Sequence, residues 1–300
     1  MKRVIVTGAT SMLGSALIKE CIANGVEVVA IARNGSDKGG RIPSHELVKV
    51  VQCDLDKLKE LSISGVADVF YHFAWAGTSK ENRDDPRIHL KNVEYTLDAI
   101  ELARRCGCKM FVGAGSQAEY GICTGKIYSD TCVQPVTSYG IAKYTAGKLG
   151  EKLCQKFGMK CVWTRIFSVY GEHDGENTMI KYALRQFASG QPAQFSAATQ
   201  MWNYLYEGDA GKIFYLLGEK DVSEGVYNVA SEDTRPLKDF IIELKEVYGK
   251  EAACQFAPPS NQPAVSLDPD ISSLTQAIGW RPDTPFRQGI TKTLNYFKIM

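Results

Sequence analysis

The sequence lacks several features that mark special classes of protein. Its 35 basic and 34 acidic residues nearly cancel, and it has no basic run or arginine-rich arm. Nucleic acid and an anionic membrane surface are therefore excluded as expected partners. No apolar run approaches the length of a membrane span, and the apolar start of the chain stops at Thr7-Gly8, too soon for an export signal. Internal repeats and low-complexity segments are absent as well.

The nine cysteines show no pattern of a disulfide framework. Nine is an odd number, and several cysteines, such as Cys21 and Cys161, stand inside apolar segments. Cys106-Gly107-Cys108 is too tight a pair for a zinc site, and it has no second pair and no histidine nearby. Reduced thiols of this kind are typical of the cytosol, so we expect a cytoplasmic protein without a bound metal.

What the chain does contain is a strand–turn–helix–strand unit near its start. Val4-Ile5-Val6 is a short apolar run typical of a buried parallel strand. A turn with glycines at Gly8 and Gly14 leads into a helix expected over 15–23, and a second strand is expected over 26–31. Glycines let backbone amides approach a pyrophosphate, and the helix N-terminus adds the positive end of its dipole. The unit predicts a dinucleotide-binding site.

The same rhythm continues to about residue 171. Strands alternating with helices predict an α/β fold, a Rossmann doubly wound parallel sheet. The further strands are expected over 47–52, 66–74, 109–113 and 160–166, with helices over 86–105 and 138–157. After Gly171 the rhythm breaks, which predicts a smaller C-terminal α+β substrate-binding domain. We assign 1–172 and about 201–232 to the dinucleotide-binding domain, and about 173–200 and 233–300 to the substrate-binding domain.

The six residues from Ser138 to Lys143 predict the opening of a helix, with Ser138 at or beside the N-cap. Tyr139 and Lys143 are four apart and share one helix face. A lysine ammonium beside a phenol favours the phenolate and lowers the pKa of the tyrosine, so the pair could exchange a proton with a substrate. Alternatively, it is a solvated surface pair. Ser116 ends a predicted strand, where ligands of such sheets bind, so we expect it beside Tyr139.

The order of these landmarks resembles the extended short-chain dehydrogenase/reductases, in the branch of nucleotide-sugar epimerases, dehydratases and reductases. The resemblance covers nearly the whole chain. It implies a homodimer that pairs the helices bearing Asn92 and Tyr139. The residues that carry it are Thr7, Gly8, Gly14, Asp54, Ser116, Tyr139, Lys143, Arg165, Tyr170 and Gly171.

The resemblance implies that Tyr139 is the acid/base, that Lys143 is its partner and bonds the nicotinamide ribose, and that Ser116 bonds the substrate oxygen. The residues implied in cofactor binding are Gly8, Thr10, Ser11, Met12, Leu13, Gly14, Arg33, Asp54, Leu55, Phe73, Ala74, Trp75, Tyr139, Lys143 and Ile166. Those implied in substrate binding are Ser116, Gln117, Ser168 and Trp202. The alternatives are a loop-capping role for Ser116 and a helix N-cap at Asp54. We interpret Asn92, His72 and His173 as structural.

Departures from the family pattern narrow the chemistry. At the end of the second strand, Ala32 and Arg33 stand where NAD-preferring members carry an acidic residue for the ribose 2′-hydroxyl. A guanidinium suits a 2′-phosphate, so NADP(H) is favoured and NAD(H) is the alternative. Ser11 replaces a glycine and narrows the phosphate turn. Gln117-Ala118 replaces the Asp-Glu of the dehydratases, which makes a 4,6-dehydratase unexpected.

The substrate side departs further. Ser168 stands in place of asparagine, Trp202 in place of arginine, and Pro258-Pro259-Ser260-Asn261 in place of Arg-Pro-x-Asp. These changes weaken the usual diphosphate clamp. Trp202 either stacks on a base or sugar or is a core aromatic.

Three hypotheses follow. The first is an NADP(H)-dependent reductase of a keto group, at C4, of a nucleotide-activated deoxysugar. The second is an NAD-dependent nucleotide-sugar C4 epimerase, or a dehydrogenase of another alcohol. The third, of another class, is a non-catalytic redox-sensing protein that binds the dinucleotide.

Overall fold

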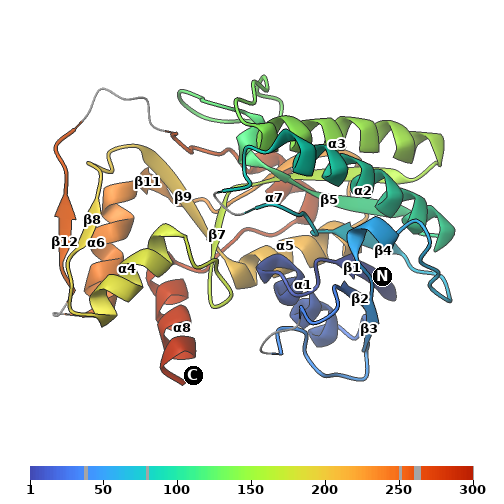
Figure 1. Cartoon of the computed structure of the whole chain (residues 1–300), viewed down its shortest axis with the longest axis horizontal. Helices are drawn as coiled ribbons and strands as arrows, with labels where there is room; N and C mark the ends of the chain where they lie inside the picture. Colours follow the sequence, from blue (N-terminus) through green and yellow to red (C-terminus); the bar gives the residue numbers. More distant parts are fainter. Residues whose placement is uncertain (37–39, 79–80, 250–251, 260–264, 300) are drawn as a thin grey trace.

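A seven-stranded parallel sheet forms the centre of the structure, a computed structural model (Figure 1). Its spatial order is β10-β6-β5-β4-β1-β2-β3, so the chain runs outward from β1 first to one side and then to the other. The direction reverses between β1 and β4, which is where such sheets bind ligands. The predicted Rossmann doubly wound fold is confirmed. The strands are β1 (Arg3–Thr7), β2 (Glu27–Ala32), β3 (Val48–Gln52), β4 (Val69–His72), β5 (Met110–Ser116), β6 (Lys160–Ile166) and β10 (Gly225–Val229).

The structure describes residues 1–36, 40–78, 81–249, 252–259 and 265–299, without the side chains of 298 and 299. The late segment Pro258-Pro259-Ser260-Asn261, expected to replace a diphosphate clamp, lies partly outside these described residues. None of the described helices is long and apolar enough to cross a membrane.

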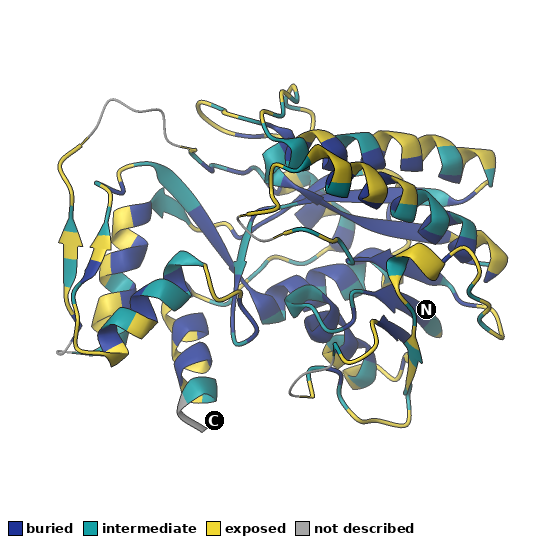
Figure 2. Cartoon of the chain, in the orientation of Figure 1, coloured by how far each residue is buried: buried dark blue, intermediate teal, exposed yellow. Residues whose placement is uncertain are grey.

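Helices cover both faces of the sheet (Figure 1). The helices α1 (Met12–Ala23) and α5 (Glu207–Glu219) pack side by side on one face, and α2 (Pro86–Arg105) and α3 (Ser138–Lys156) on the other. Because the sheet is covered on both faces, its inner strands are almost continuously buried (Figure 2). Val4 and Val6 of β1 point into the core beneath α1 and α5, whereas Ile5 points into the core beneath α2 and α3.

Side-chain caps set the starts of these helices. Ser11 caps α1 by accepting a hydrogen bond from the Gly14 N–H, and Thr137 caps α3 by accepting from the Gly140 N–H, each over 3.1 Å. Asp85 caps α2 just before its first residue, Pro86. These caps satisfy amide donors that have no partner within the helix. The cap at Thr137 makes Ser138 the first residue of α3, one position after the cap.

The register brings the carboxyl ends of the strands to one edge. Thr7 of β1 pairs with Ile31 of β2 and His72 of β4, and Ser116 of β5 pairs with Ile166 of β6. The loops that follow these residues therefore gather at the same edge. Two short 3-10 helices lie there, η1 (Leu55–Lys57) after β3 and η2 (Gln117–Glu119) after β5.

The C-terminal third adds a second, smaller core (Figure 1). It is built on two small sheets, ordered β11-β9-β7 and β12-β8. Strand β9 serves both cores, because Leu205 belongs to the main core while its neighbours Tyr204 and Tyr206 belong to the second. The remaining elements are β7 (Ser168–Tyr170), α4 (Met179–Ala188), β8 (Ala193–Phe195), β9 (Met201–Tyr206), β11 (Thr234–Pro236), α6 (Leu237–Tyr248), β12 (Cys254–Phe256), α7 (Ser272–Ile278) and α8 (Phe286–Ile299).

The predicted elements agree with the observed ones to within a few residues. The helix over 86–105 has the bounds expected, whereas α1 begins at Met12, three residues earlier than expected, because Ser11 caps it. The domain assignment is not as clean as predicted. Strand β9 was expected in the dinucleotide-binding domain, but it pairs with β7 and β11 rather than with the main sheet. The division into two domains stays a prediction.

Candidate active site

The loop after β1 is shaped by two glycines. Gly8 has φ +67°, and a Cβ there would lie 2.7 Å from the backbone nitrogen of Ala74. A Cβ on Gly14 would lie 2.3 Å from the carbonyl oxygen of Gly8. No side chain fits at either position, so the loop, the start of α1 and the end of β4 pack backbone to backbone. Ser11, in place of the family glycine, supplies the cap of α1.

A cavity of about 610 Å³ opens beside this loop. It runs over the carboxyl ends of β1, β2, β3 and β4, the edge predicted for a dinucleotide. Its lining includes eight of the predicted cofactor residues: Gly8, Thr10, Ser11, Arg33, Leu55, Phe73, Ala74 and Trp75. Gly14 is buried beneath it and Asp54 is exposed between lining residues Cys53 and Leu55. Asp54 precedes η1 but makes no side-chain cap bond.

Two further polar side chains, which were not predicted from the sequence, line the same cavity as Arg33. They are Ser36, whose hydroxyl donates to the Arg33 carbonyl over 2.7 Å, and Arg41, whose guanidinium donates to the Thr10 carbonyl over 3.3 Å. Arg41 lies in the loop after β2, and no sequence motif around it predicts that it lines the cavity. No carboxylate is among the described residues that line the cavity, so its charge is positive near the end of β2.

A second cavity, of about 390 Å³, lies between the start of α1 and the C-terminal third. Five more of the predicted residues line it, namely Met12, Leu13, Ile166, Ser168 and Trp202, whereas Ser116, Gln117, Tyr139 and Lys143 are in the described lining of neither cavity. Its lining also includes Asp174, Thr178 and Tyr204. Among the described lining residues there is no lysine or arginine.

Trp202 packs as a core aromatic, one of its two predicted roles, and its predicted stacking on a base or sugar stays a prediction. It packs against the second core and is one wall of this second cavity. Its indole nitrogen is buried and has no hydrogen-bond partner among the described residues. A buried donor of this kind is costly to leave unpaired.

Ser116 and Tyr139 meet as predicted, although 23 positions separate them in the sequence. The Ser116 side chain acts on the Tyr139 phenol and tends to lower its pKa. Burial outweighs this effect, so the pKa of Tyr139 is raised above its ordinary value. The expectation that Lys143 lowers the pKa of Tyr139 is wrong here. The cation nearest the ring is Arg83, 4.6 Å from its centroid, whereas the Lys143 nitrogen is 5.8 Å away.

Lys143 is buried behind Trp75. Its Nζ donates to the Ala114 carbonyl over 2.6 Å and lies 3.7 Å from the centre of a Trp75 ring. Burial lowers the pKa of Lys143 to about 7, and the carboxylate of Glu119 opposes that fall. The lysine therefore changes charge near neutral pH. Trp75 also packs edge-on against Tyr139, so one aromatic ring contacts both members of the predicted pair.

Asn92 and His72 have the structural roles expected of them. The Asn92 amide donates to the carbonyls of Ala76 and Ile88 and accepts from the Ala76 N–H, which fixes the loop after β4. His72 Nδ1 hydrogen-bonds the Thr7 hydroxyl over 2.8 Å. Burial lowers the pKa of His72 to about 3, so the ring is neutral.

His173 belongs to a cluster that the sequence argument did not foresee. Its Nδ1 lies 3.0 Å from a carboxylate oxygen of Glu207. Glu172 is close as well, because one ring nitrogen of His173 and one carboxylate oxygen each of Glu172 and Glu207 lie within 4.8 Å of one another. Burial raises the pKa of Glu207 to about 7. The cluster joins the loop after β7 to the start of α5, away from the two cavities' described linings.

Glu119 is the other side chain that was missed. It is fully buried next to Ser116 and pairs with Arg165, one of the family landmarks. Gln117 and Ala118 occupy the positions of the dehydratase Asp-Glu pair, and no role was predicted for Glu119, the residue after them. Gln117 itself begins η2.

Comparison with known proteins gives a consistent result. The model of the NAD dependent epimerase/dehydratase family matches residues 4–230. A Bacillus subtilis (strain 168) protein described as an uncharacterized UDP-glucose epimerase is 26% identical, over 99% of this chain and 98% of its own. The dTDP-4-dehydro-6-deoxyglucose reductase of Escherichia coli is 25% identical, over 97% and 96%. The crystal structure of UDP-glucuronic acid 4-epimerase from Bacillus cereus in complex with NAD has a TM-score of 0.86 at 22% identity, over 99% and 96%.

Proposed function

The chain belongs to the NAD dependent epimerase/dehydratase family of extended short-chain dehydrogenase/reductase enzymes, and from this premise we propose that it is an NADP(H)-dependent reductase of a keto group in a nucleotide-activated deoxysugar. The keto group is at C4. The observation that carries the proposal is that Tyr139 packs against Trp75, which lines a cavity of about 610 Å³ with two guanidinium groups, while Ser116 acts on the same phenol.

The residues present fit a nicotinamide dinucleotide. Gly8 leaves no room for a side chain between the loop and Ala74, so the backbone of the loop itself lines the cavity at the N-terminus of α1. That is the arrangement that binds a pyrophosphate. Gly8, Thr10 and Ser11 would hold the phosphates, and Trp75 and Lys143 the nicotinamide ribose end. When bound, the nicotinamide supplies the hydride.

Tyr139 is placed to donate the proton. Its raised pKa keeps the phenol protonated at neutral pH, which is the form a reduction needs. Ser116, whose side chain acts on the same phenol, would orient and polarise the substrate oxygen. Lys143, whose pKa is about 7, is suited to return a proton to Tyr139 after each turnover.

The end of β2 supports NADP(H). Arg33 is exposed at the cavity, Arg41 lines it, and the buried Ala32 offers no carboxylate to a ribose 2′-hydroxyl. A charge-assisted hydrogen bond to a 2′-phosphate contributes about 1.5 to 3 kcal/mol, or about a 10- to 100-fold change in affinity.

Cofactor titration tests this preference. We expect NADPH to bind the wild-type protein more tightly than NADH, and Arg33→Ala to weaken NADPH by about 10- to 100-fold while NADH affinity stays the same. The matched control is Arg104→Ala, because Arg104 lies in the last turn of α2, at the opposite edge of the sheet. Tighter binding of NADH by the wild-type protein would overturn the NADP(H) assignment.

The second candidate is an NAD-dependent nucleotide-sugar C4 epimerase, which the likeness to a C4 epimerase crystallised with NAD favours. An epimerase returns its hydride and consumes no NADPH. Supplying dTDP-4-keto-6-deoxyglucose with NADPH, and UDP-glucose without added cofactor, separates the two: oxidation of NADPH supports the reductase, and interconversion of the UDP-sugars the epimerase. A redox-sensing protein of the third class would turn over neither and would be unaffected by Tyr139→Phe.

The second cavity suits the sugar rather than the diphosphate. Trp202 offers an aromatic side chain, and Ser168 and Thr178 offer hydroxyls. These groups match the apolar face and the hydroxyls of a sugar ring. Trp202→Ala, which removes the ring, tests whether that side chain binds substrate.

The homodimer also remains a proposal. Leu90 on α2 and Ile141 and Leu149 on α3 are large apolar side chains left exposed on the two helices expected to pair. Apolar residues gathered on two adjacent helices suit a subunit interface. Light scattering after size exclusion would show twice the mass of 33.1 kDa if the dimer forms. The cytoplasmic location, inferred from the cysteines, likewise stays a prediction.

A further inference from the structure

We propose that Glu119 is a positioning residue, whose buried carboxylate fixes Ser116, the partner of Tyr139 in the proposed proton transfer. The proposal rests on the proposed function in one respect, that Tyr139 is the proton donor. Glu119 does not touch the cavity where the cofactor is expected. It acts on the reaction through the two residues in front of it.

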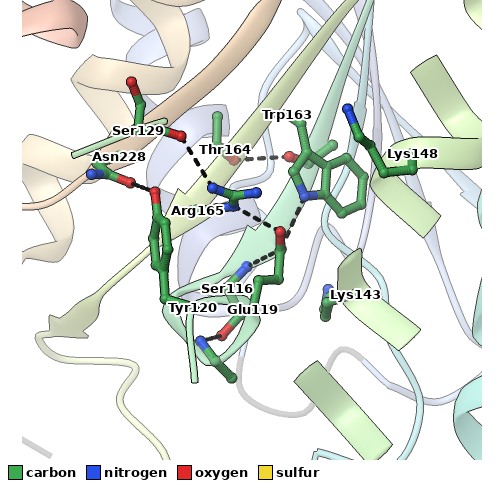
Figure 3. A network of polar contacts seen from close by, with 12 residues as sticks. Ser116, Glu119, Tyr120, Ser129, Lys143, Lys148, Trp163, Thr164, Arg165 and Asn228 are labelled. Atoms are coloured by element: carbon green, nitrogen blue, oxygen red, sulfur yellow. Dashed lines mark hydrogen bonds and ion pairs between the residues drawn. The ribbon is translucent and has the colours of Figure 1, made fainter. Parts of the chain in front are cut away.

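Three donors hold the carboxylate (Figure 3). One oxygen accepts from the Ser116 backbone N–H over 2.9 Å and from the Trp163 indole N–H over 3.0 Å. The other accepts from Arg165 Nε over 2.9 Å. Glu119 has no exposed surface, so a carboxylate could remain charged there only with such partners.

The contact with Ser116 transmits the position of Glu119 to the reacting groups. Ser116 caps η2 by accepting a hydrogen bond from the Ala118 N–H over 3.2 Å, while Glu119 at the end of η2 accepts from the Ser116 N–H. This reciprocal capping box ties both ends of a one-turn helix. Ser116, whose side chain acts on the Tyr139 phenol, is thus held through both its hydroxyl and its backbone N–H.

Trp163 and Arg165 anchor the carboxylate to the sheet. Added Cβ atoms on Gly113, Gly115 and Gly147 would each lie within 2.7 Å of the Trp163 ring, so three glycines form its seat. Arg165 also donates to the Ser129 carbonyl over 3.1 Å and lies 4.4 Å from the centre of the Tyr120 ring. These contacts leave the pair little freedom to move.

The charge of Glu119 acts on both members of the proton-transfer pair in the same sense. It raises the pKa of Tyr139, and it raises the pKa of Lys143 against the effect of burial. The other groups facing Tyr139 are Arg83, over its ring, and His89, 5.5 Å away between ring centres. Buried His72, whose pKa is about 3, faces Lys143 without a charge.

The test compares Glu119→Gln with wild type. Glutamine keeps an oxygen for the Ser116 N–H but removes the charge. The Tyr139 titration is read by NMR on the ¹³C-labelled tyrosine ring, with Tyr139→Phe to assign the signal. We expect Tyr139 to ionise at lower pH in Glu119→Gln, the alkaline limb of kcat to move to lower pH, and kcat at neutral pH to fall about 10- to 100-fold. Glu151→Gln, an exposed carboxylate on the same helix as Tyr139, should change none of these.

An unchanged Tyr139 titration in Glu119→Gln would overturn the proposal, whatever the activity. If the Tyr139 titration shifts in Glu119→Gln but the wild-type protein reduces no keto-sugar, the role of Glu119 stands and the proposed reductase is refuted instead. Should the unpaired Arg165 prevent folding, Glu119→Gln with Arg165→Gln removes both charges and is read in the same way.

Discussion

The burial of Lys143 destabilises the fold while the lysine is charged, and this cost can be measured. Its pKa in the folded protein is about 7, against an ordinary value of 10.5. At about 1.4 kcal/mol for each pH unit, that difference corresponds to about 5 kcal/mol of lost stability while the lysine is charged in the unfolded chain. Replacing it by methionine keeps the length of the side chain and removes the charge. This substitution removes the charge penalty, but it also leaves the Ala114 carbonyl without its donor, which costs about 2 kcal/mol of stability.

The sign follows from the two pKa values. Because the folded pKa lies below the unfolded one, the penalty is complete below about pH 7 and disappears as pH rises toward 10.5. We therefore expect Lys143→Met to be more stable than wild type by about 3 kcal/mol at pH 6 and about equal to it at pH 9. Catalytic turnover should be lost at both.

Urea unfolding of wild type and Lys143→Met at the two pH values provides the measurement, with Lys148→Met, exposed on the same helix, as the control. A variant less stable than wild type at pH 6 would refute the reasoning. So would a stability difference that is the same at pH 6 and pH 9, because the charge of Lys143 would then not be its cause.

Two further predictions concern the fold around the site. Burial raises the pKa of Glu207 from 4.5 to about 7, so its ionisation lowers the stability fully above pH 7 and not at all below pH 4.5. In urea unfolding, the stability of Glu207→Gln relative to wild type should therefore rise by up to about 3 kcal/mol from pH 4 to pH 8. A stability difference that is the same at both pH values would contradict this. A Cβ on Gly115 would lie 2.4 Å from the Trp163 indole nitrogen and 2.5 Å from Glu119, so Gly115→Ala should destabilise by about 1 to 3 kcal/mol in thermal unfolding. Gly175→Ala, whose nearest neighbour would be 3.7 Å away, is its control and should unfold near the wild-type temperature.

The features that the sequence predicted well depend on short-range patterns. An apolar run, a turn with glycines and a helix of the right period suffice to predict β1, the loop at Gly8 and α1. Pro86 after a capping aspartate gives α2 its first residue. Alternation of strands and helices then allows few topologies, because crossovers between parallel strands have one hand. The neighbourhood of Ser116 and Tyr139 follows from the shared edge of the sheet.

Long-range pairs could not be predicted in this way. Glu119 and Arg165 are 46 positions apart, and nothing in a run of residues shows that a glutamate will meet an arginine in the core. Arg41 reaches the cavity from a loop without a motif. The direction of the pKa of Tyr139 was predicted wrongly for a related reason, since burial depends on the whole fold and here exceeds the effect of a nearby cation.

Strand β9 has a consequence for how the molecule unfolds. Leu205 is embedded in one core while Tyr204 and Tyr206, its two neighbours, are embedded in the other. Melting either core pulls this one strand apart and exposes apolar surface in both, so neither half gains by opening alone. We therefore expect the two cores to unfold together in a single cooperative transition.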